Sequence, residues 1–222
     1  MARACSCVRL SRSAYYRAPD DWTVRDAPII ACLAKLIEDR PSRGFWMCRK
    51  LLRREGHDSV WSADFMSDAL ICGRRYRLFN VVDDFNREAL HIEVDTSINS
   101  ERLIRVFDRL RKQRGLPQIL RTDNGPEFLG EAFTQWAKSA GMAIQYIQPG
   151  KPNQNAYIER FNRTLRNELL DQHLFVRLED VREAAYWWLL EYNEERPHDA
   201  LGDLTPIEYA EVARNSSSEL SP

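Results

Sequence analysis

Apolar residues recur with two different periods along this chain, and the change of period divides it into a helical front and a sheet-forming remainder. From Asp26 to Arg40 they recur every three or four positions, which predicts a helix, and a second helix is expected from Phe45 to Glu55. Shortly after this second helix, runs of bulky β-forming residues begin. We therefore predict a helical segment over residues 1–57, a core over residues 58–213 and a disordered tail over residues 214–222.

The core pattern predicts three strands, followed by helices and strands in alternation and then by further helices. Strands are expected at 60–66, 76–82, 89–94, 118–122 and 143–148, and helices at 100–114, 130–140, 178–192 and around Glu159. Three successive strands favour an antiparallel meander. The order βββαβαβ followed by a long helix predicts an α/β fold with a mixed sheet and helices on its faces.

Composition places the chain among ordinary globular proteins. Its 222 residues, 44% hydrophobic and 29% charged, allow one good-sized core. No apolar run approaches the roughly 18 residues of a membrane span, and the N-terminus lacks the apolar core of a secretory signal. Five cysteines without zinc-ligand spacing favour reduced thiols. We expect a cytoplasmic protein that is not bound to a membrane.

The net charge of -1 combines two opposite parts. Residues 1–56 hold 12 Lys+Arg against 6 Asp+Glu, whereas the remainder is acidic by 7 charges. A basic front favours a polyanionic partner, and Arg12 and Arg17, on a predicted helix-turn-helix remnant, are candidate DNA contacts. Packing of a small helical appendage is the alternative for this part. The acidic remainder suits a module that gathers carboxylates around divalent cations, or it consists of solvated faces.

Two carboxylates stand out in the core, with 35 residues between them. Asp123 reads as the end of the strand predicted before it, and strand ends are common places for functional sites. Glu159 belongs to a helix whose apolar stripe can pack while a polar stripe faces a ligand. The polar stripe consists of Asn155, Glu159, Arg163 and Arg166.

Asp64 is the best candidate for a third acid, because Asp is disfavoured inside a strand between Ala63 and Phe65 unless a function requires it. Its competitors are Asp68, which follows the predicted strand, and Asp83 and Asp84, which fall in a turn where solvated acids are expected. Three carboxylates without nearby His or Cys are typical of a site for Mg²⁺ or Mn²⁺.

Two such ions, roughly 4 Å apart, can activate an attacking hydroxyl and stabilise the leaving oxygen at a phosphodiester. Arg163 and Arg166 would then contact the backbone of the substrate strand, as would Asn155 on the same stripe, and Lys151 in the preceding loop adds a possible phosphate contact. Exposure to solvent alone is the alternative for the two arginines.

From about Val60 to Tyr209 the chain closely resembles the DD(35)E transposases of bacterial insertion sequences, relatives of retroviral integrases. The similarity is to the second-frame product of the insertion-sequence-three type. It is carried by Trp61-Ser62-Ala63-Asp64-Phe65, Asp83 to Glu88, Thr122 to Phe128, Pro149 to Pro152, Gln154 to Asn162, Tyr192 to His198, Leu201 and Thr205-Pro206.

The resemblance implies an RNase H-like fold and a catalytic triad of Asp64, Asp123 and Glu159 that binds the metal ions. It further implies cleavage of double-stranded DNA at element ends, joining of the freed 3′-hydroxyl to target DNA and a homo-oligomer, with a first-frame protein as a candidate partner. In similar proteins the segment like Arg40 to Gly56 is followed by several tens more residues before the tryptophan that matches Trp61. We therefore expect an internal deletion here.

Two other readings stay open. A catalytically idle, truncated transposase could bind DNA or inhibit an intact relative, which the missing segment favours. A general RNase H-like nuclease is the other, although its substrate contacts would not require the pattern from Pro149 to Asn162. His198 belongs to the family motif, and we expect it to make a structural hydrogen bond.

Overall fold

The structure is a computed structural model that describes residues 27–40, 59–148 and 155–218. The chain divides into two compact units, residues 1–52 and 53–222. In the first, the helix α4 (Ala27–Asp39) confirms the helix predicted from the apolar period. The second predicted helix and the boundary after residue 57 lie outside the described residues and stay predictions.

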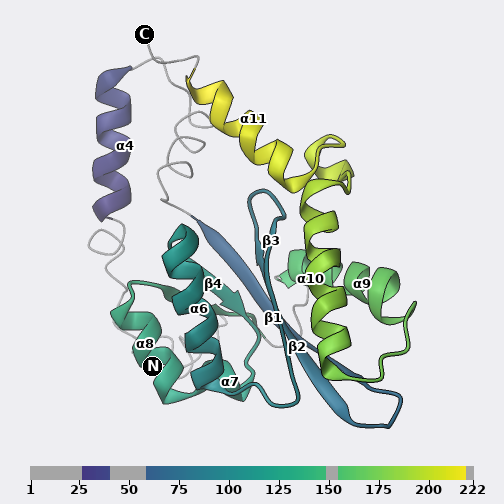
Figure 1. Cartoon of the computed structure of the whole chain (residues 1–222). Helices are drawn as coiled ribbons and strands as arrows, with labels where there is room; N and C mark the ends of the chain where they lie inside the picture. The colour runs from purple at the N-terminus through teal and green to yellow at the C-terminus, as the bar shows by residue number, and fades with distance from the viewer. Residues whose placement is uncertain (1–26, 41–58, 149–154, 219–222) are drawn as a thin grey trace, which may run out of the picture. The chain divides into compact units, whose positions relative to one another are not determined.

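The second unit is built on a five-stranded mixed sheet (Figure 1). Its strands are β1 (Val60–Ala69), β2 (Arg75–Asp83), β3 (Ala89–Asp95), β4 (Ile119–Thr122) and β5 (Ala143–Tyr146), in the spatial order β3-β2-β1-β4-β5. The first three strands form the predicted antiparallel meander. β4 pairs parallel with β1, and β5 pairs parallel with β4. The mixed sheet expected from the order of elements is confirmed.

Helices cover both faces of this sheet. One face carries α6 (Ser100–Arg114), α7 (Pro126–Leu129) and α8 (Glu131–Ser139), and the other carries α9 (Ala156–Leu165), the π-helical segment η2 (Arg166–Leu170) and α10 (Leu178–Glu194). The 3-10 turn η3 (Asp199–Leu201) and α11 (Pro206–Ser218) follow. Because side chains alternate along a strand, Leu78 packs into one layer and its neighbour Phe79 into the other.

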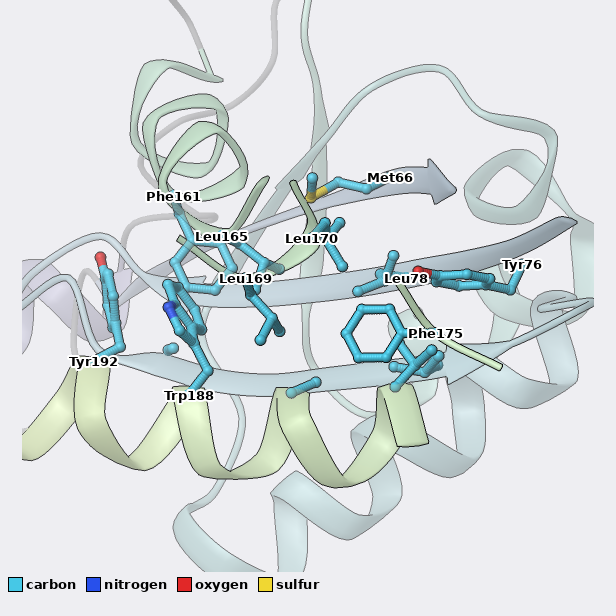
Figure 2. Close-up of a cluster of buried hydrophobic side chains, with 14 of the residues drawn as sticks. Met66, Tyr76, Leu78, Phe161, Leu165, Leu169, Leu170, Phe175, Trp188 and Tyr192 are labelled. Atoms are coloured by element: carbon cyan, nitrogen blue, oxygen red, sulfur yellow. The ribbon is translucent and has the colours of Figure 1, made fainter. Parts of the chain in front are cut away.

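The core under α9 and α10 fixes the helix that carries Glu159. Figure 2 shows Phe161 of α9 among Trp188 and Tyr192 of α10, with ring centroids 5.5 and 5.1 Å from that of Phe161. Phe161 is 1% exposed, and full burial of such a side chain contributes about 1.5–3 kcal/mol. The helix is thereby held against the sheet at the turn that carries the candidate acid.

The π-helical segment η2 changes the face that the helix buries. The 3.6-residue period predicts Leu169 in the apolar stripe but not its neighbour Leu170. Both are 5% exposed in the structure. A π turn holds more residues than an α turn, so two successive leucines can reach the same core.

Some predicted ends of elements are wrong. Ser100, a residue type that favours caps, was expected to cap the helix predicted over residues 100–114, but Asn99 caps α6, because its side chain accepts a hydrogen bond from the backbone N–H of Arg102. Ser100 Oγ instead donates to the backbone oxygen of Glu127, 2.8 Å away. The short helix α7 was not predicted, and α11 continues to Ser218, within the stretch expected to be disordered. No helix in the described ranges is both long and apolar enough to cross a bilayer.

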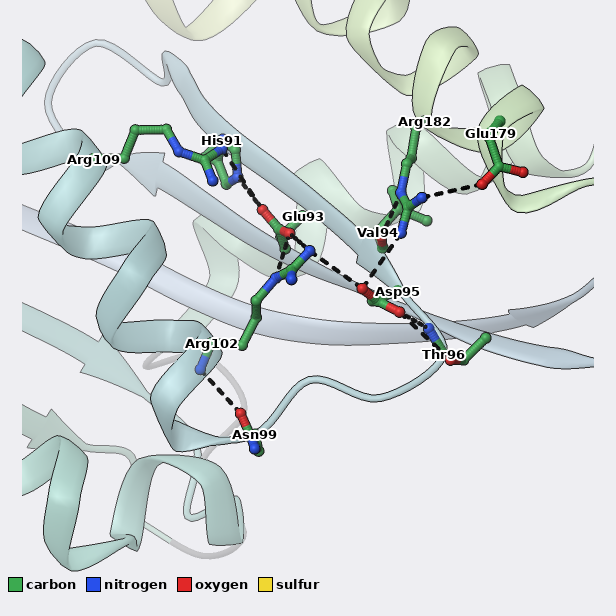
Figure 3. A network of polar contacts seen from close by, with 10 residues as sticks. All are labelled: His91, Glu93, Val94, Asp95, Thr96, Asn99, Arg102, Arg109, Glu179 and Arg182. Carbon is green, nitrogen blue, oxygen red and sulfur yellow. Dashed lines mark hydrogen bonds and ion pairs between the residues drawn. The ribbon is translucent and has the colours of Figure 1, made fainter.

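The edge strand β3 is joined to α6 and α10 by a polar network (Figure 3). Glu93 is 7% exposed and accepts hydrogen bonds from Arg102 of α6 (2.7 Å). Its other oxygen lies 2.8 Å from the His91 ring. Arg182 of α10 donates to the backbone oxygen of Val94 and contacts Asp95.

Candidate acidic active site

The three predicted acids come from three elements that meet at one face of the sheet. Asp64 lies within β1, Asp123 directly follows β4, and Glu159 is in the first turn of α9. The parallel ladder pairs Ser62 with Arg121. Continued by two residues beyond the paired positions, this register would place Asp64 next to Asp123, because neighbouring strands lie about 4.8 Å apart. The short strand before Asp123 was predicted; Asp123 itself lies one residue beyond it.

The charges of Asp123 and Glu159 act on Asp64. The pKa of Asp64 is raised to about 6, chiefly because the carboxyl is buried and also because Asp123 and Glu159 bring negative charge near it. Hydrogen bonds to Asp64 act in the opposite direction and only partly offset this effect. The structure therefore brings Asp123 and Glu159 within electrostatic reach of Asp64.

Asp64 is oriented by two donors that the sequence analysis did not identify as functional. The backbone N–H of Phe65 donates to its Oδ1 (2.8 Å), and Asn162 Nδ2 of α9 donates to its Oδ2 (2.9 Å). Asn162 Oδ1 accepts in turn from Asn80 Nδ2 at 2.7 Å. This chain of hydrogen bonds ties the sheet to the helix one turn after Glu159.

A signal for these two residues was present in the sequence. Asn80 stands inside a predicted strand between Phe79 and Val81, although asparagine is depleted in strands, and it lies opposite Asp64 in the β1–β2 ladder. It is 0% exposed, and Asn162 is 9% exposed. Buried amides of this kind need partners, so a polar residue among apolar strand positions indicates a buried polar contact.

Asp123 is held by the turn that follows β4. The backbone N–H of Gly125 donates to Asp123 Oδ1 at 3.0 Å. A Cβ atom at Gly125 would lie 3.0 Å from Asp123 Oδ1 and 3.2 Å from an oxygen of Glu127. A side chain at this position would crowd both carboxylates, whereas the backbone itself is in an ordinary conformation.

Asp68, one competitor for the third acid, is neutralised by a cation. Arg166 Nη1 donates to Asp68 Oδ2 (3.1 Å), and Arg166 Nη2 donates to the backbone oxygen of Ser67 (2.9 Å). We had predicted that Arg166 contacts a DNA strand. Its side chain is instead bound to β1. Arg163, one α-turn from Glu159, is exposed.

Asp83 and Asp84 are not the solvated turn acids that the sequence suggested. Asp83 ends β2 and accepts hydrogen bonds from Trp61 Nε1 (3.2 Å) and from the backbone N–H of Phe85 (2.7 Å). Burial, the largest influence, raises the pKa of both carboxyls. The expectation failed because the partners of this turn come from distant parts of the chain.

The other predicted DNA contacts have different outcomes. Asn155 is 2% exposed, so its side chain is not presented to a DNA strand, and that prediction is not supported. Lys151, Arg12 and Arg17 lie outside the described residues and stay predictions. His198 packs edge-on against Tyr192, with ring centroids 4.8 Å apart. Burial lowers the pKa of His198, and a hydrogen bond to the backbone of Tyr192 partly offsets this effect. The structural hydrogen bond expected for His198 is therefore supported.

The donor set suits a hard divalent cation. Asp64, Asp123 and Glu159 offer carboxylate oxygens, the ligands that Mg²⁺ and Mn²⁺ prefer. In the described part of the chain no three acidic, His or Cys side chains are already close enough to share one ion. Like charges repel, and the raised pKa of Asp64 reflects that repulsion as well as burial. A cation would remove this repulsion and let the carboxylates approach.

Comparison with known proteins agrees with this arrangement. Two family models, both described as Integrase core domain, match residues 54–152 and 140–206. A solved structure, the HTLV-2 integrase catalytic core domain in complex with magnesium (trimeric form), matches with a TM-score of 0.54 and 21% identity. The match covers 68% of this chain and 94% of that one. The sheet and its flanking helices therefore have the RNase H-like fold of retroviral integrase cores.

Relatives in bacterial insertion elements extend the similarity beyond the core. An uncharacterized 31.7 kDa protein of insertion element IS407 from Burkholderia multivorans is 37% identical over 249 aligned positions, which cover 94% of this chain and 89% of the relative. An uncharacterized 39.2 kDa protein of IS476 from Xanthomonas euvesicatoria is 42% identical over 73% of this chain and 47% of its own length. The chain belongs to the family of bacterial insertion-element transposases with an integrase core domain.

Proposed function

We propose that this chain is a metal-dependent DNA strand transferase that cuts the ends of its insertion element and joins them to target DNA. The observation that carries the proposal is that Asp123 and Glu159 lie near enough to the buried Asp64 for their charges to raise its pKa. We assign all three to catalysis and to metal binding. Acidic clusters with perturbed pKa values are typical of sites that act through divalent ions.

Mg²⁺ or Mn²⁺, as two ions held by these carboxylates, would activate the attacking oxygen and stabilise the leaving 3′ oxygen. The chain itself supplies orientation. Asn162 holds the Asp64 carboxylate by one oxygen, and Gly125 holds Asp123 by one oxygen, so the second oxygen of Asp123 stays available. Asp64 must lose its proton to bind a cation, and its pKa of about 6 implies that this occurs near neutral pH.

The substrate is double-stranded DNA, namely the element ends and a target. Exposed Arg163 next to the acids would contact the phosphate backbone, and we keep Lys151, Arg12 and Arg17 as further candidate contacts. We expect a homo-oligomer, because two element ends must be joined in one complex, and a first-frame protein of the element is a possible partner. A reaction on bacterial DNA places the protein in the cytoplasm.

A second candidate function is that of an idle, truncated transposase that inhibits an intact relative. It is favoured by the alignment with the Burkholderia protein. That alignment runs over 249 positions, more than the 222 residues of this chain, so it must contain gaps in this chain. This supports the internal deletion inferred from the sequence. A shortened end-binding segment would leave the acidic site in place but weaken assembly on DNA.

Joining of labelled duplex tests these alternatives. Duplex carrying the DNA that flanks this reading frame is incubated with Mn²⁺ and either wild type or Asp123→Asn, and the products are separated on a denaturing gel. Joined product in wild type alone supports the transferase. Equal product with Asp123→Asn contradicts it, and no product from wild type together with inhibition of an intact relative supports the second candidate.

A further inference from the structure

The β2–β3 turn, residues Asp84 to Arg87, contacts each of the three elements that carry a candidate acid. Ser62 Oγ of β1 donates to Asp84 Oδ1 at 2.6 Å, and Arg121 Nη1 of β4 donates to Asp84 Oδ2 at 2.7 Å. The guanidinium carbon of Arg87 lies 3.4 Å from the ring centroid of Tyr157 in α9. The mechanism proposed above uses none of these residues.

The three contacts stand at the same separation in sequence from the three acids, although residues two apart share a face only in a strand and not in a helix. Ser62, Arg121 and Tyr157 each stand two residues before an acid, namely before Asp64, Asp123 and Glu159. In a strand, residues two apart point to the same face, so Ser62 and Arg121 lie in the row next to the two aspartates. In α9, Tyr157 begins the same turn as Glu159. A shift of the turn would therefore reach all three acids.

The contacts are also buried enough to be strong. Ser62 is 0% exposed, and the side chains of Asp84 and Arg121 are 10% and 22% exposed. Both oxygens of Asp84 are engaged, each by a different strand. Hydrogen bonds to a charged group with little access to water are stronger than exposed ones.

Arg87 has an uncommon backbone conformation that a hydrogen bond fixes. Its φ of 63° lies in the left-handed region, which residues other than glycine rarely adopt. Its backbone N–H donates to Asp83 O at 2.9 Å, which fixes the turn. A guanidinium over an aromatic ring is attracted by the ring's electrons. Asn155, at the cap position of α9, makes no capping hydrogen bond with its side chain. The stack of Arg87 on Tyr157 therefore supports the first turn of α9.

We propose that Asp84 and Arg87 make the β2–β3 turn a positioning element, which sets the separation of the three acids by holding β1, β4 and α9 from one turn. Neither residue touches the reacting atoms. The proposal rests on the acidic site of the proposed function. It assigns a task to the Asp83-Asp84-Phe85-Asn86-Arg87-Glu88 motif that the catalytic acids leave unexplained.

The test uses Arg87→Asn, because asparagine tolerates the left-handed backbone and is too short to place a cation over the Tyr157 ring. Tyr157→Leu removes the ring from the other side, Tyr157→Phe keeps it, and Arg74→Asn removes an exposed arginine from the β1–β2 hairpin as a matched control. Hydrogen exchange of the α9 amides from Arg160 to Arg163 is measured without metal, and Mn²⁺ affinity is measured by calorimetry.

We expect Arg87→Asn and Tyr157→Leu to exchange these amides several-fold faster and to bind Mn²⁺ roughly 10–100-fold more weakly. Melting temperatures should stay close to that of Arg74→Asn, and Tyr157→Phe should restore both readouts. Unchanged exchange and unchanged Mn²⁺ affinity in both variants would overturn the proposal. Retained Mn²⁺ binding in Asp123→Asn would instead contradict the acidic site, while the metal-free exchange would still decide the role of the turn.

Discussion

At the scale of single residues, the raised pKa of Asp64 lowers the stability of the metal-free protein at neutral pH. Its pKa of about 6 lies above the ordinary value of 3.8, so the folded state binds this proton more tightly than the unfolded state. The stability that the neutral form provides is complete below about pH 4 and is lost as pH rises through 6. Ionised Asp64 therefore destabilises the metal-free protein at neutral pH.

Asp64→Asn should consequently stabilise the metal-free protein at pH 8, by up to about 3 kcal/mol for a shift of roughly two pKa units. The gain should shrink between pH 6 and pH 4, where wild type becomes protonated. Urea unfolding at several pH values measures it. A variant that is less stable than wild type at pH 8 would show that burial and like charge do not dominate at Asp64.

Asn162 should matter both for stability and for reaction. Asn162→Ala removes the donor to Asp64 and leaves the buried amide of Asn80 without its acceptor, so we expect a loss of about 1–3 kcal/mol. Joining activity should fall as well, because Asp64 loses its orientation. Asn167→Ala, an exposed residue in the π segment η2, is the matched control. Equal unfolding midpoints for the two variants would refute the role of Asn162.

At the scale of elements, the network of Figure 3 should govern the attachment of β3 to α6 in acid. Burial alone would raise the pKa of Glu93, but hydrogen bonds and charges from His91 and Arg102 outweigh it and lower the pKa to about 2. A depressed acid contributes stability above its unfolded pKa, near 4.5, and loses it as pH falls toward 2.

Arg102→Met should therefore raise the pH at which the protein unfolds in acid, because Glu93 then takes up its proton earlier. Circular dichroism between pH 2 and pH 6 follows this transition. Arg105→Met, at an exposed position of the same helix, should leave it unchanged. Coincident acid transitions for the two variants would mean that the network does not hold the edge strand.

At the scale of the whole molecule, local periodicity predicted the sheet well, since β1 to β5 each carry the expected β-forming runs. The choice of Asp64 as a candidate acid also rested on a local conflict, an acid between two apolar strand neighbours. Features that depend on residues far apart in the sequence were not predicted. The burial of Asp84 depends on Ser62 and Arg121, which are distant in sequence. The π segment η2 was not predicted, because the predicted apolar stripe assumes a uniform α-helical period.

The central claim is that three acids from β1, β4 and α9 form one metal site. Calorimetric titration with Mn²⁺ tests it most directly, with wild type compared with Asp64→Asn, Asp123→Asn and Glu159→Gln in folded protein. We predict that wild type binds Mn²⁺ and that each substitution weakens binding by at least about tenfold, since every acid supplies a ligand. Binding that survives all three substitutions unchanged would contradict the account.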